Sequence, residues 1–178
     1  VGKKSSEYRV LSLTLNGVIE RDIESNMGKM PASFDTYQIV KPDSLLLCLF
    51  DIDVTPRTIG YVEQLGIVSS AYTNLEKINN KVFSKYFYYW FLMLDMDKTL
   101  LHLSKNLRNS IGSEEFSALF SILPTRNEQE KIALFLDEKI RQIDKLINMK
   151  QKQIEILQKY RLSLITETVT RGLDPYVK

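Results

Sequence analysis

Residues 136–164 decide the fold, and they read LDEKIRQIDKLINMKQKQIEILQKYRLSL. Apolar side chains return along this stretch in steps of four and three residues, with two vacancies that Lys150 and Arg161 fill. Such a repeat of about 3.5 residues makes a slowly drifting stripe on a helix, and another long helix buries that stripe best. The stretch therefore predicts either a dimerisation arm or a spacer. Its seam consists of Leu136, Ile140, Ile143, Ile147, Lys150, Ile154, Leu157, Arg161 and Leu164.

The predicted helix extends beyond the seam on both sides. Asn127 suits an N-cap, and Glu130 follows three residues later, as in a capping box. Arg171-Gly172 suits the C-terminus, and Pro175 bars continuation. From residue 128 to residue 170 the helix would measure about 65 Å, at about 1.5 Å per residue. We assign residues 124–172 to this helix and residues 173–178 to a tail.

Residues 1–83 indicate short strands joined by turns. Alternating β-formers at residues 8–15, followed by the turn pair Asn16-Gly17, predict a hairpin. The apolar run Leu45–Phe50 predicts a buried strand, and Cys48 inside it is expected to be a core residue rather than a ligand or nucleophile. Two shorter strands are predicted at residues 58–62 and 66–68.

Helical patterns begin further along the chain. Ser84 is the expected N-cap of a helix to about residue 103, whose apolar side chains run nearly all round, so we expect it to be largely buried. Ser113 begins a further short helix, and residues 120–123 suggest a last strand. The expected fold class is α+β, with a small mixed α/β domain at residues 1–123 followed by one long helix in an antiparallel coiled coil.

Charge divides weakly between the two parts. Residues 1–123 hold 13 Lys and Arg against 14 Asp and Glu, and residues 124–178 hold 11 against 8. Neither part is basic enough to predict nucleic-acid binding from composition. One cysteine allows no intrachain disulfide, which accords with a reducing cytoplasm. No leader and no apolar run of about 18 residues is visible, so we expect a cytoplasmic protein without a membrane span.

The sequence offers no complete catalytic constellation. Asp51 and Asp53 follow an apolar strand, as the nucleophile pair of haloacid-dehalogenase phosphatases does. That chemistry also needs a lysine and a later acidic pair for magnesium, whereas Asp95 and Asp97 lie inside the predicted aromatic helix. His102 is the single histidine and lies in no ligand cluster. We therefore expect a non-catalytic protein with no metal site and no cofactor.

Polar side chains gather between the aromatic helix and the last predicted strand. Arginine can pair with guanine through two hydrogen bonds, asparagine with adenine, and lysine can hold phosphates. An ordinary polar loop would have the same composition, and this ambiguity extends to residues 21–29 and to Arg57. The candidate DNA contacts are Lys105, Asn106, Arg108, Asn109, Arg21, Asn26, Lys29 and Arg57.

Several motifs, in order along the chain, resemble those of the specificity subunit of type I restriction–modification systems. Gly66-Ile-Val-Ser-Ser-Ala-Tyr72 resembles a strand and turn of that family, and Tyr86-Phe87-Tyr88-Tyr89 resembles its aromatic helix. Arg108 with Ser113-x-Glu115-Phe116 resembles its arginine-containing loop and the following helical turn. Five further stretches resemble the entry, the middle and the end of the family's conserved helix. The entry matches Leu123-Pro124, Glu128-Gln129-x-x-Ile132 and Phe135-Leu136-Asp137, and the middle and end match Ile143-Asp144-x-Leu146-Ile147 and Leu164-Ile-Thr-Glu167-x-Val169-Thr170-x-Gly172.

The resemblance implies a division of labour. Residues 1–123 would form a target recognition domain that reads one half of a split double-stranded DNA sequence, and the helix would be a conserved spacer that pairs antiparallel. A full-length subunit of the family has two such units and is not itself catalytic. It docks methyltransferase subunits, which flip and methylate adenine, and restriction subunits join through them.

The chain also departs from the family pattern. It holds one recognition domain and one helix, begins at Val1 without the usual tryptophan-containing strand, and has Leu123-Pro-Thr-Arg-Asn127 in place of a double proline. It is either the C-terminal half of a longer subunit or a half-subunit that pairs its helix with a copy of itself. Twofold pairing would then require a palindromic split target.

Two other functions stay open at this stage. The chain could be the recognition part of a fused adenine-N6 DNA methyltransferase, with its catalytic half upstream, or a coiled-coil oligomerisation protein. The two charges in the seam are open as well. Lys150 and Arg161 either set the register, because a misaligned partner would bury an unpaired charge, or extend out of the seam into water.

Overall fold

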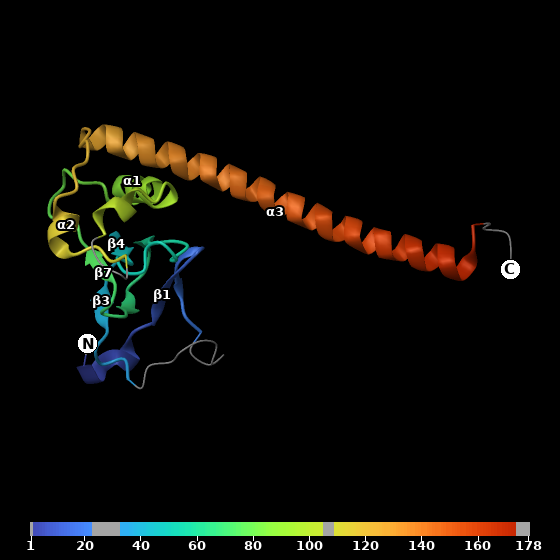
Figure 1. Ribbon diagram of the computed structural model, residues 1–178, viewed down its shortest axis with the longest axis horizontal. Coiled ribbons are helices and arrows are strands. Elements are labelled where there is room, and N and C mark those ends of the chain that lie inside the picture. Colours follow the sequence, from blue (N-terminus) through green and yellow to red (C-terminus); the bar gives the residue numbers. More distant parts are fainter. Residues whose placement is uncertain (1, 23–32, 105–108, 174–178) are drawn as a thin grey trace. The chain divides into compact units, whose positions relative to one another are not determined.

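The computed structural model describes residues 2–22, 33–104 and 109–173. These residues form two compact units, Val1–Ala133 and Leu134–Lys178, and each is described by itself. The first unit contains small antiparallel sheets and short helices, and the second is made of the greater part of one long helix (Figure 1). The expected α+β class with a long C-terminal helix is confirmed.

The predicted N-terminal hairpin is present. Strands β1 (Leu11–Thr14) and β2 (Gly17–Glu20) pair antiparallel, with Thr14 opposite Gly17. Gly17 has a φ of 97°, a conformation that glycine adopts without steric strain. The Thr14 hydroxyl donates to the Gly17 carbonyl at 3.1 Å and accepts from the Asn16 amide at 3.1 Å, which closes the turn.

A three-stranded antiparallel sheet forms the middle of the first unit. Strand β4 (Ser44–Leu47) lies between β5 (Ile59–Val62) and β7 (Thr73–Leu75), and all four of its residues are buried. The predicted buried strand is therefore confirmed. The regular strand ends at Leu47 rather than at the predicted Phe50. The Cys48 amide still donates to the Thr58 carbonyl at 2.8 Å, but the chain then turns at Asp51, which has a φ of 48°.

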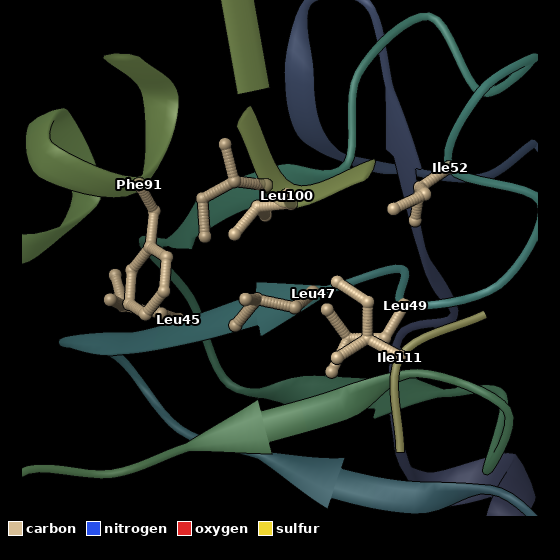
Figure 2. Packing of buried hydrophobic residues seen from close by; sticks show 8 residues of the cluster. Leu45, Leu47, Leu49, Ile52, Phe91, Leu100 and Ile111 are labelled. Atoms are coloured by element: carbon tan, nitrogen blue, oxygen red, sulfur yellow. The ribbon is translucent and has the colours of Figure 1, made fainter. Parts of the chain in front are cut away.

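Strand β4 contributes to two hydrophobic cores. Leu45 and Leu47 pack with Phe91, Leu100 and Ile111, as Figure 2 shows. Leu46 lies in the second core with residues of four other strands, namely Leu11, Val40, Val62 and Val68. Because alternate residues of a strand point to opposite faces, an uninterrupted apolar run is explained by burial on both sides. Cys48 is buried and unpaired, as predicted, and burial raises the pKa of its thiol.

The second core is closed by a two-stranded sheet. Strands β3 (Gln38–Val40) and β6 (Gly66–Val68) pair antiparallel, with Val40 opposite Gly66. A Cβ atom at Gly66 would lie 2.8 Å from the Arg9 carbonyl oxygen and 2.6 Å from Leu11 Cγ. Only glycine therefore lets β6 approach the start of β1 this closely.

The aromatic helix differs from its prediction in extent, start and burial. Helix α1 (Ser84–Met96) is followed by the 3₁₀ helix η2 (Thr99–Leu103), because Lys98 between them takes a left-handed conformation with a φ of 50°. The N-cap of α1 is Phe83 rather than Ser84, and the Phe83 side chain makes no capping hydrogen bond. The expectation of a largely buried helix is wrong. Only Ser84, Phe91 and Asp95 of α1 are buried, because the helix packs on one face of the sheet.

The Asp95 carboxylate joins α1 to the sheet. It accepts from the Thr58 amide at 2.8 Å and from Lys98 Nζ at 3.0 Å. Lys98 also donates to the Thr55 carbonyl at 2.9 Å. A buried carboxylate is thus paired with one cation and one backbone donor, which offsets the cost of its desolvation.

The chain between the sheet and the long helix contains one confirmed and one wrong prediction. Helix α2 (Ser113–Ser117) is present as expected. Residues 120–123 form no strand, although all four are described, and Phe120 and Ile122 are 94% and 84% exposed. The apolar pattern of residues 120–123 favours a strand, but none of the described strands pairs with these residues.

The long helix α3 (Arg126–Arg171) begins one residue earlier than its predicted cap. The capping box is Thr125 with Glu128 rather than Asn127 with Glu130. The Thr125 amide and hydroxyl donate to Glu128 Oε2 at 2.9 and 2.7 Å. The first two turns belong to the first unit, where buried Gln129 accepts from the Phe83 amide at 2.8 Å. Within the described part of the chain, no helix is long and apolar enough to cross a membrane.

Candidate nucleic-acid interface

The candidate DNA contacts fall into three groups in the structure. Arg21, Arg57 and Asn109 are described. Lys105, Asn106 and Arg108 lie in residues 105–108, and Asn26 and Lys29 lie in residues 23–32, so these five fall outside the described residues. Described residues lie next to each of these two segments, residues 23–32 and 105–108.

The described residues that follow residues 105–108 bond to the chain that follows β4. The Asn109 carbonyl accepts from the Ile52 amide at 3.3 Å, and the Ile111 amide donates to the Leu49 carbonyl at 2.8 Å. Asn109 has a φ of 45°, and its side-chain Oδ1 accepts from the Ser104 hydroxyl at 3.3 Å. Asparagine tolerates this left-handed conformation better than most residues. Ser104 and Asn109 therefore bring the two ends of the segment together.

Two described residues on either side of residues 23–32, Arg21 and Tyr37, influence the pKa of Tyr72. Burial raises the pKa of the Tyr72 phenol, and Cys48 and Tyr37 add to the rise. A hydrogen bond with Ser12 and the positive charge of Arg21 oppose it. Arg21 precedes the segment and Tyr37 follows it, so the chain on both sides lies within electrostatic reach of one ring.

The ring of Tyr72 stacks on Phe50, with ring centroids 6.4 Å apart and an interplanar angle of 30°. Phe50 is two residues from Ile52, whose amide bonds to Asn109. Phe50 thus lies between Leu49 and Ile52, the two residues that bond to the chain at Ile111 and Asn109.

The charge at this place is mixed rather than basic. Asp51 and Asp53 lie in the loop after β4, and Arg21 and Asp22 follow the end of β2. The Asp51 carbonyl accepts from the Val54 and Thr55 amides at 3.2 and 2.9 Å, so the loop is a compact polar turn, as the sequence favoured over a phosphatase motif. Among the described residues no group of His, Cys, Asp and Glu could hold a metal ion.

Arg57 lies in a different environment. Its guanidinium donates to the Ile59 carbonyl at 3.2 Å, to the Leu15 carbonyl at 2.5 Å and to the Tyr88 hydroxyl. Leu15 is in the β1–β2 turn and Tyr88 is on α1, so Arg57 ties the hairpin to the helix. Partners that are 31 and 42 residues away in sequence could not be read from local composition.

Two residues that the sequence did not select as DNA contacts form an aromatic pair in the structure. They are Phe50 and Tyr72. Phe50 is partly exposed, although the sequence placed it in a buried strand. The one local signal was its position at the end of an apolar run, next to two aspartates. His102 is exposed on η2, in keeping with a surface residue.

The seam of α3 is exposed along the second unit. Its isoleucine and leucine residues from Ile140 to Leu164 are 38% to 64% exposed. A second apolar row lies one residue before the seam positions and is 52% to 65% exposed, consisting of Phe135, Leu146, Met149, Ile156 and Tyr160. A continuous exposed apolar surface of this kind marks an interaction site.

Comparison with known proteins adds the fold. No family model matches the chain, and no curated protein matches it. The fold is similar to that of a chain in the solved structure "Structural basis underlying complex assembly and conformational transition of the type I R-M system", with a TM-score of 0.63 and 16% sequence identity. The likeness covers 76% of this chain and 33% of that chain, so this protein spans about a third of its neighbour's length. This chain therefore has the fold of part of a chain in a type I restriction–modification assembly.

Proposed function

We propose that this protein is a non-catalytic DNA sequence-specificity component of a type I restriction–modification system. The observation that carries the proposal is the fold shared with a chain of such a system over three quarters of this chain. The ordered motifs from Gly66 to Gly172 support it independently. A likeness that covered only a long helix would carry less weight, because long helices occur in many folds.

In this proposal residues 1–123 are a target recognition domain. It reads one half of a split double-stranded DNA target through Lys105, Asn106, Arg108, Asn109, Arg21, Asn26 and Lys29. Support comes from the contacts of Asn109 with Ile52 and Ser104, and from the Phe50–Tyr72 pair on the adjoining chain. Arginine and asparagine supply the bidentate contacts that distinguish guanine and adenine.

The long helix is the scaffold of the proposed complex. It pairs antiparallel with a copy of itself and docks methyltransferase subunits, through which restriction subunits join. Support comes from the two exposed apolar rows on α3, which mark it as an interaction surface. The methyltransferase subunits would supply most phosphate contacts, because this chain has a net charge of only +2.

The proposed reading residues can be tested in an assembled complex. The chain is co-expressed with its methyltransferase subunit, and methylated adenines are mapped by sequencing for the wild type, Arg108→Ala and Arg9→Ala. Arg9 is a matched control, because it is an exposed arginine of the same unit paired with Glu20 at 2.9 Å. We expect Arg108→Ala to relax or abolish the methylated motif while Arg9→Ala leaves it intact.

Two results would contradict the proposal at different points. An assembled wild-type complex that methylates no defined motif would remove the specificity function. A motif that Arg108→Ala leaves unchanged, in a complex shown to be assembled by size-exclusion chromatography, would remove residues 105–108 from the reading surface.

A further inference from the structure

We propose that two copies of α3 pair antiparallel in one specific register, in which Ile147 lies opposite Leu157 of the partner copy. This inference rests on the self-pairing in the proposed function and names its geometry. In this register Lys150 lies opposite the partner's Ile154, and the twofold axis passes beside residue 152. The seam sequence, its two charges and the exposed residues beside it carry the argument.

The charges in the seam exclude a parallel pair. In a parallel, in-register pair each seam residue faces its own copy, so Lys150 would face Lys150 and Arg161 would face Arg161. Two pairs of like charges would then lie in the buried seam of one interface, which is costly because neither charge has a mate. In an antiparallel pair each charge faces an apolar residue, and its aliphatic stem packs there while the charged group reaches water.

Five antiparallel registers align the seam, and they place Ile147 opposite Leu136, Ile143, Lys150, Leu157 or Leu164 of the partner. The Leu136 register would set Lys150 against the partner's Ala133, which is buried in the first unit. The Leu164 register sets Lys150 against the partner's Arg161 and repeats the like-charge conflict. The Ile143 register sets Asp144 beside its own copy at the edge of the seam. Neighbouring like charges disfavour both arrangements.

The residues flanking the seam distinguish the two registers that remain. With Ile147 opposite Leu157, Lys139 lies beside the partner's Glu167, and Leu146 lies beside the partner's Tyr160. With Ile147 opposite Lys150, Lys139 lies beside Tyr160 instead, and Leu146 lies beside Gln153. Of these two registers, only the first joins opposite charges at one of the compared positions and apolar side chains at the other.

The exposed surface of α3 agrees with that choice. Leu146 and Tyr160 are 58% and 64% exposed, although neither belongs to the seam. The proposed register covers both, twice in each dimer. Glu167 is exposed, and its carboxylate lies 3.5 Å from Arg171 of its own helix. Lys139 Nζ lies 5.7 Å from the ring centroid of its own Phe135. Both side chains therefore end on the surface, where a partner helix can reach them.

Disulfide trapping tests the register with the full chain. Ile147→Cys is co-expressed with Leu157→Cys, with Lys150→Cys or with Leu164→Cys, and each mixture is oxidised mildly and run on a non-reducing gel. Ile147→Cys alone reports parallel pairing. The wild type, which keeps buried Cys48, gives the background. A disulfide needs Cα atoms within about 7 Å, and a neighbouring register moves a pair by about 10 Å along the helix.

We expect dominant cross-linking in the mixture of Ile147→Cys with Leu157→Cys. Dominant cross-linking in either other mixture, or of Ile147→Cys with itself, would overturn the register. Absence of cross-links in every mixture would overturn the proposed register, and a monomeric wild type in analytical ultracentrifugation would overturn self-pairing as well. The assay contains no DNA and no methyltransferase, so these failures would be distinguishable from a failure of sequence reading, which the methylation map reports.

A charge exchange provides a second test. Lys139→Glu would place two carboxylates together at both ends of the seam and should raise the dimer dissociation constant about two- to tenfold. Combining it with Glu167→Lys should restore the wild-type value. Lys145→Glu on the outer face of α3 is the matched control and should leave dimerisation unchanged. A double exchange no tighter than Lys139→Glu alone, measured by analytical ultracentrifugation, would contradict the pairing of these two residues.

Discussion

Single side chains hold distant parts of the first unit together at the residue scale. Arg57 joins the β1–β2 turn to α1. Asp95 joins α1 to Thr58, the residue before β5, and Gln129 joins α3 to the chain before α1. Each is a polar group that bonds to backbone atoms or to a hydroxyl. The cost of removing one lies mainly in the partners that are left unsatisfied.

Replacing Arg57 by methionine tests its part in the fold. Methionine keeps much of the aliphatic volume and removes all donors to the Ile59 and Leu15 carbonyls and the Tyr88 hydroxyl. We expect the free energy of unfolding to fall by about 1–3 kcal/mol in urea denaturation. Arg9→Met is the control, since its exposed pair with Glu20 should contribute under about 1 kcal/mol. Equal effects at both positions would contradict the structural role of Arg57.

Asp43 makes the stability of the first unit depend on pH. Burial opposes ionisation of Asp43, but hydrogen bonds from Lys77 and Tyr61 outweigh it, so the pKa of this carboxyl lies below its ordinary value. Lys77 Nζ lies 2.5 Å from the carboxylate. A folded-state pKa below the unfolded value stabilises the fold above pH of about 4, and this stabilisation is lost as pH falls through the folded pKa.

Asp43→Asn tests that dependence. Asparagine tolerates the φ of 69° at this position, so the backbone turn should be kept. We expect the variant to be less stable than the wild type by about 1 kcal/mol at pH 7, because the ion pair is partly exposed. The difference should shrink in urea denaturation as the pH falls below about 4. A difference that stays constant down to pH 3 would contradict the assignment.

At the element scale, local signals predicted those elements whose formation depends on neighbouring residues. The Asn16-Gly17 pair predicted the hairpin, the run from Leu45 predicted β4, and the heptad repeat predicted α3. Strands β3 and β7 were missed, because each has three residues and depends on a distant partner strand. The break at Lys98 is a single left-handed residue without a sequence signature.

The start of α3 shows why boundaries are harder to predict than elements. Both Thr125-x-x-Glu128 and Asn127-x-x-Glu130 fit a capping box in sequence. The structure uses the first, since Gln129 must lie where its amide donates to the Lys81 and Pro124 carbonyls at 2.9 Å. The candidate interface was limited in the same way. Composition selected the polar segments, but the Phe50–Tyr72 pair between them depends on contacts across the fold.

Gln129→Leu tests the attachment of the first turns of α3. The substitution leaves the Phe83 amide and the Lys81 and Pro124 carbonyls without their partner, so the free energy of unfolding should fall by about 2–4 kcal/mol. Gln142→Leu is the matched control, because Gln142 is exposed and bonds only to Glu138 on the same helix. Thermal unfolding followed by circular dichroism measures both. Equal stability of the two variants would contradict the role of Gln129.

At the scale of the whole molecule, the proposed function assigns DNA reading to the first unit and assembly to the second. The first unit contains the candidate DNA contacts, and the second carries an exposed apolar seam. Neither unit has the positive charge of a protein that binds DNA tightly by itself. DNA recognition should therefore depend on the assembled complex, in which other subunits neutralise the phosphates.

The isolated chain should bind duplex DNA weakly. We expect a dissociation constant above about 1 μM at physiological salt in fluorescence anisotropy, with a steep loss of binding as salt is raised. Adding the methyltransferase subunit should tighten binding and make it sequence-dependent. Tight, sequence-specific binding by this chain alone would contradict the division between reading and phosphate binding.

The form of the methylated DNA sequence tests the central claim most directly. Two self-paired copies related by a twofold axis should direct methylation to a split palindrome, whose two halves are inverted copies at a fixed spacing. The measurement is a genome-wide map of methylated adenines in cells that express this chain with its methyltransferase subunit. From twofold self-pairing we expect one such bipartite palindromic motif. An asymmetric motif would contradict self-pairing, and an assembled complex with no motif at all would contradict the specificity function.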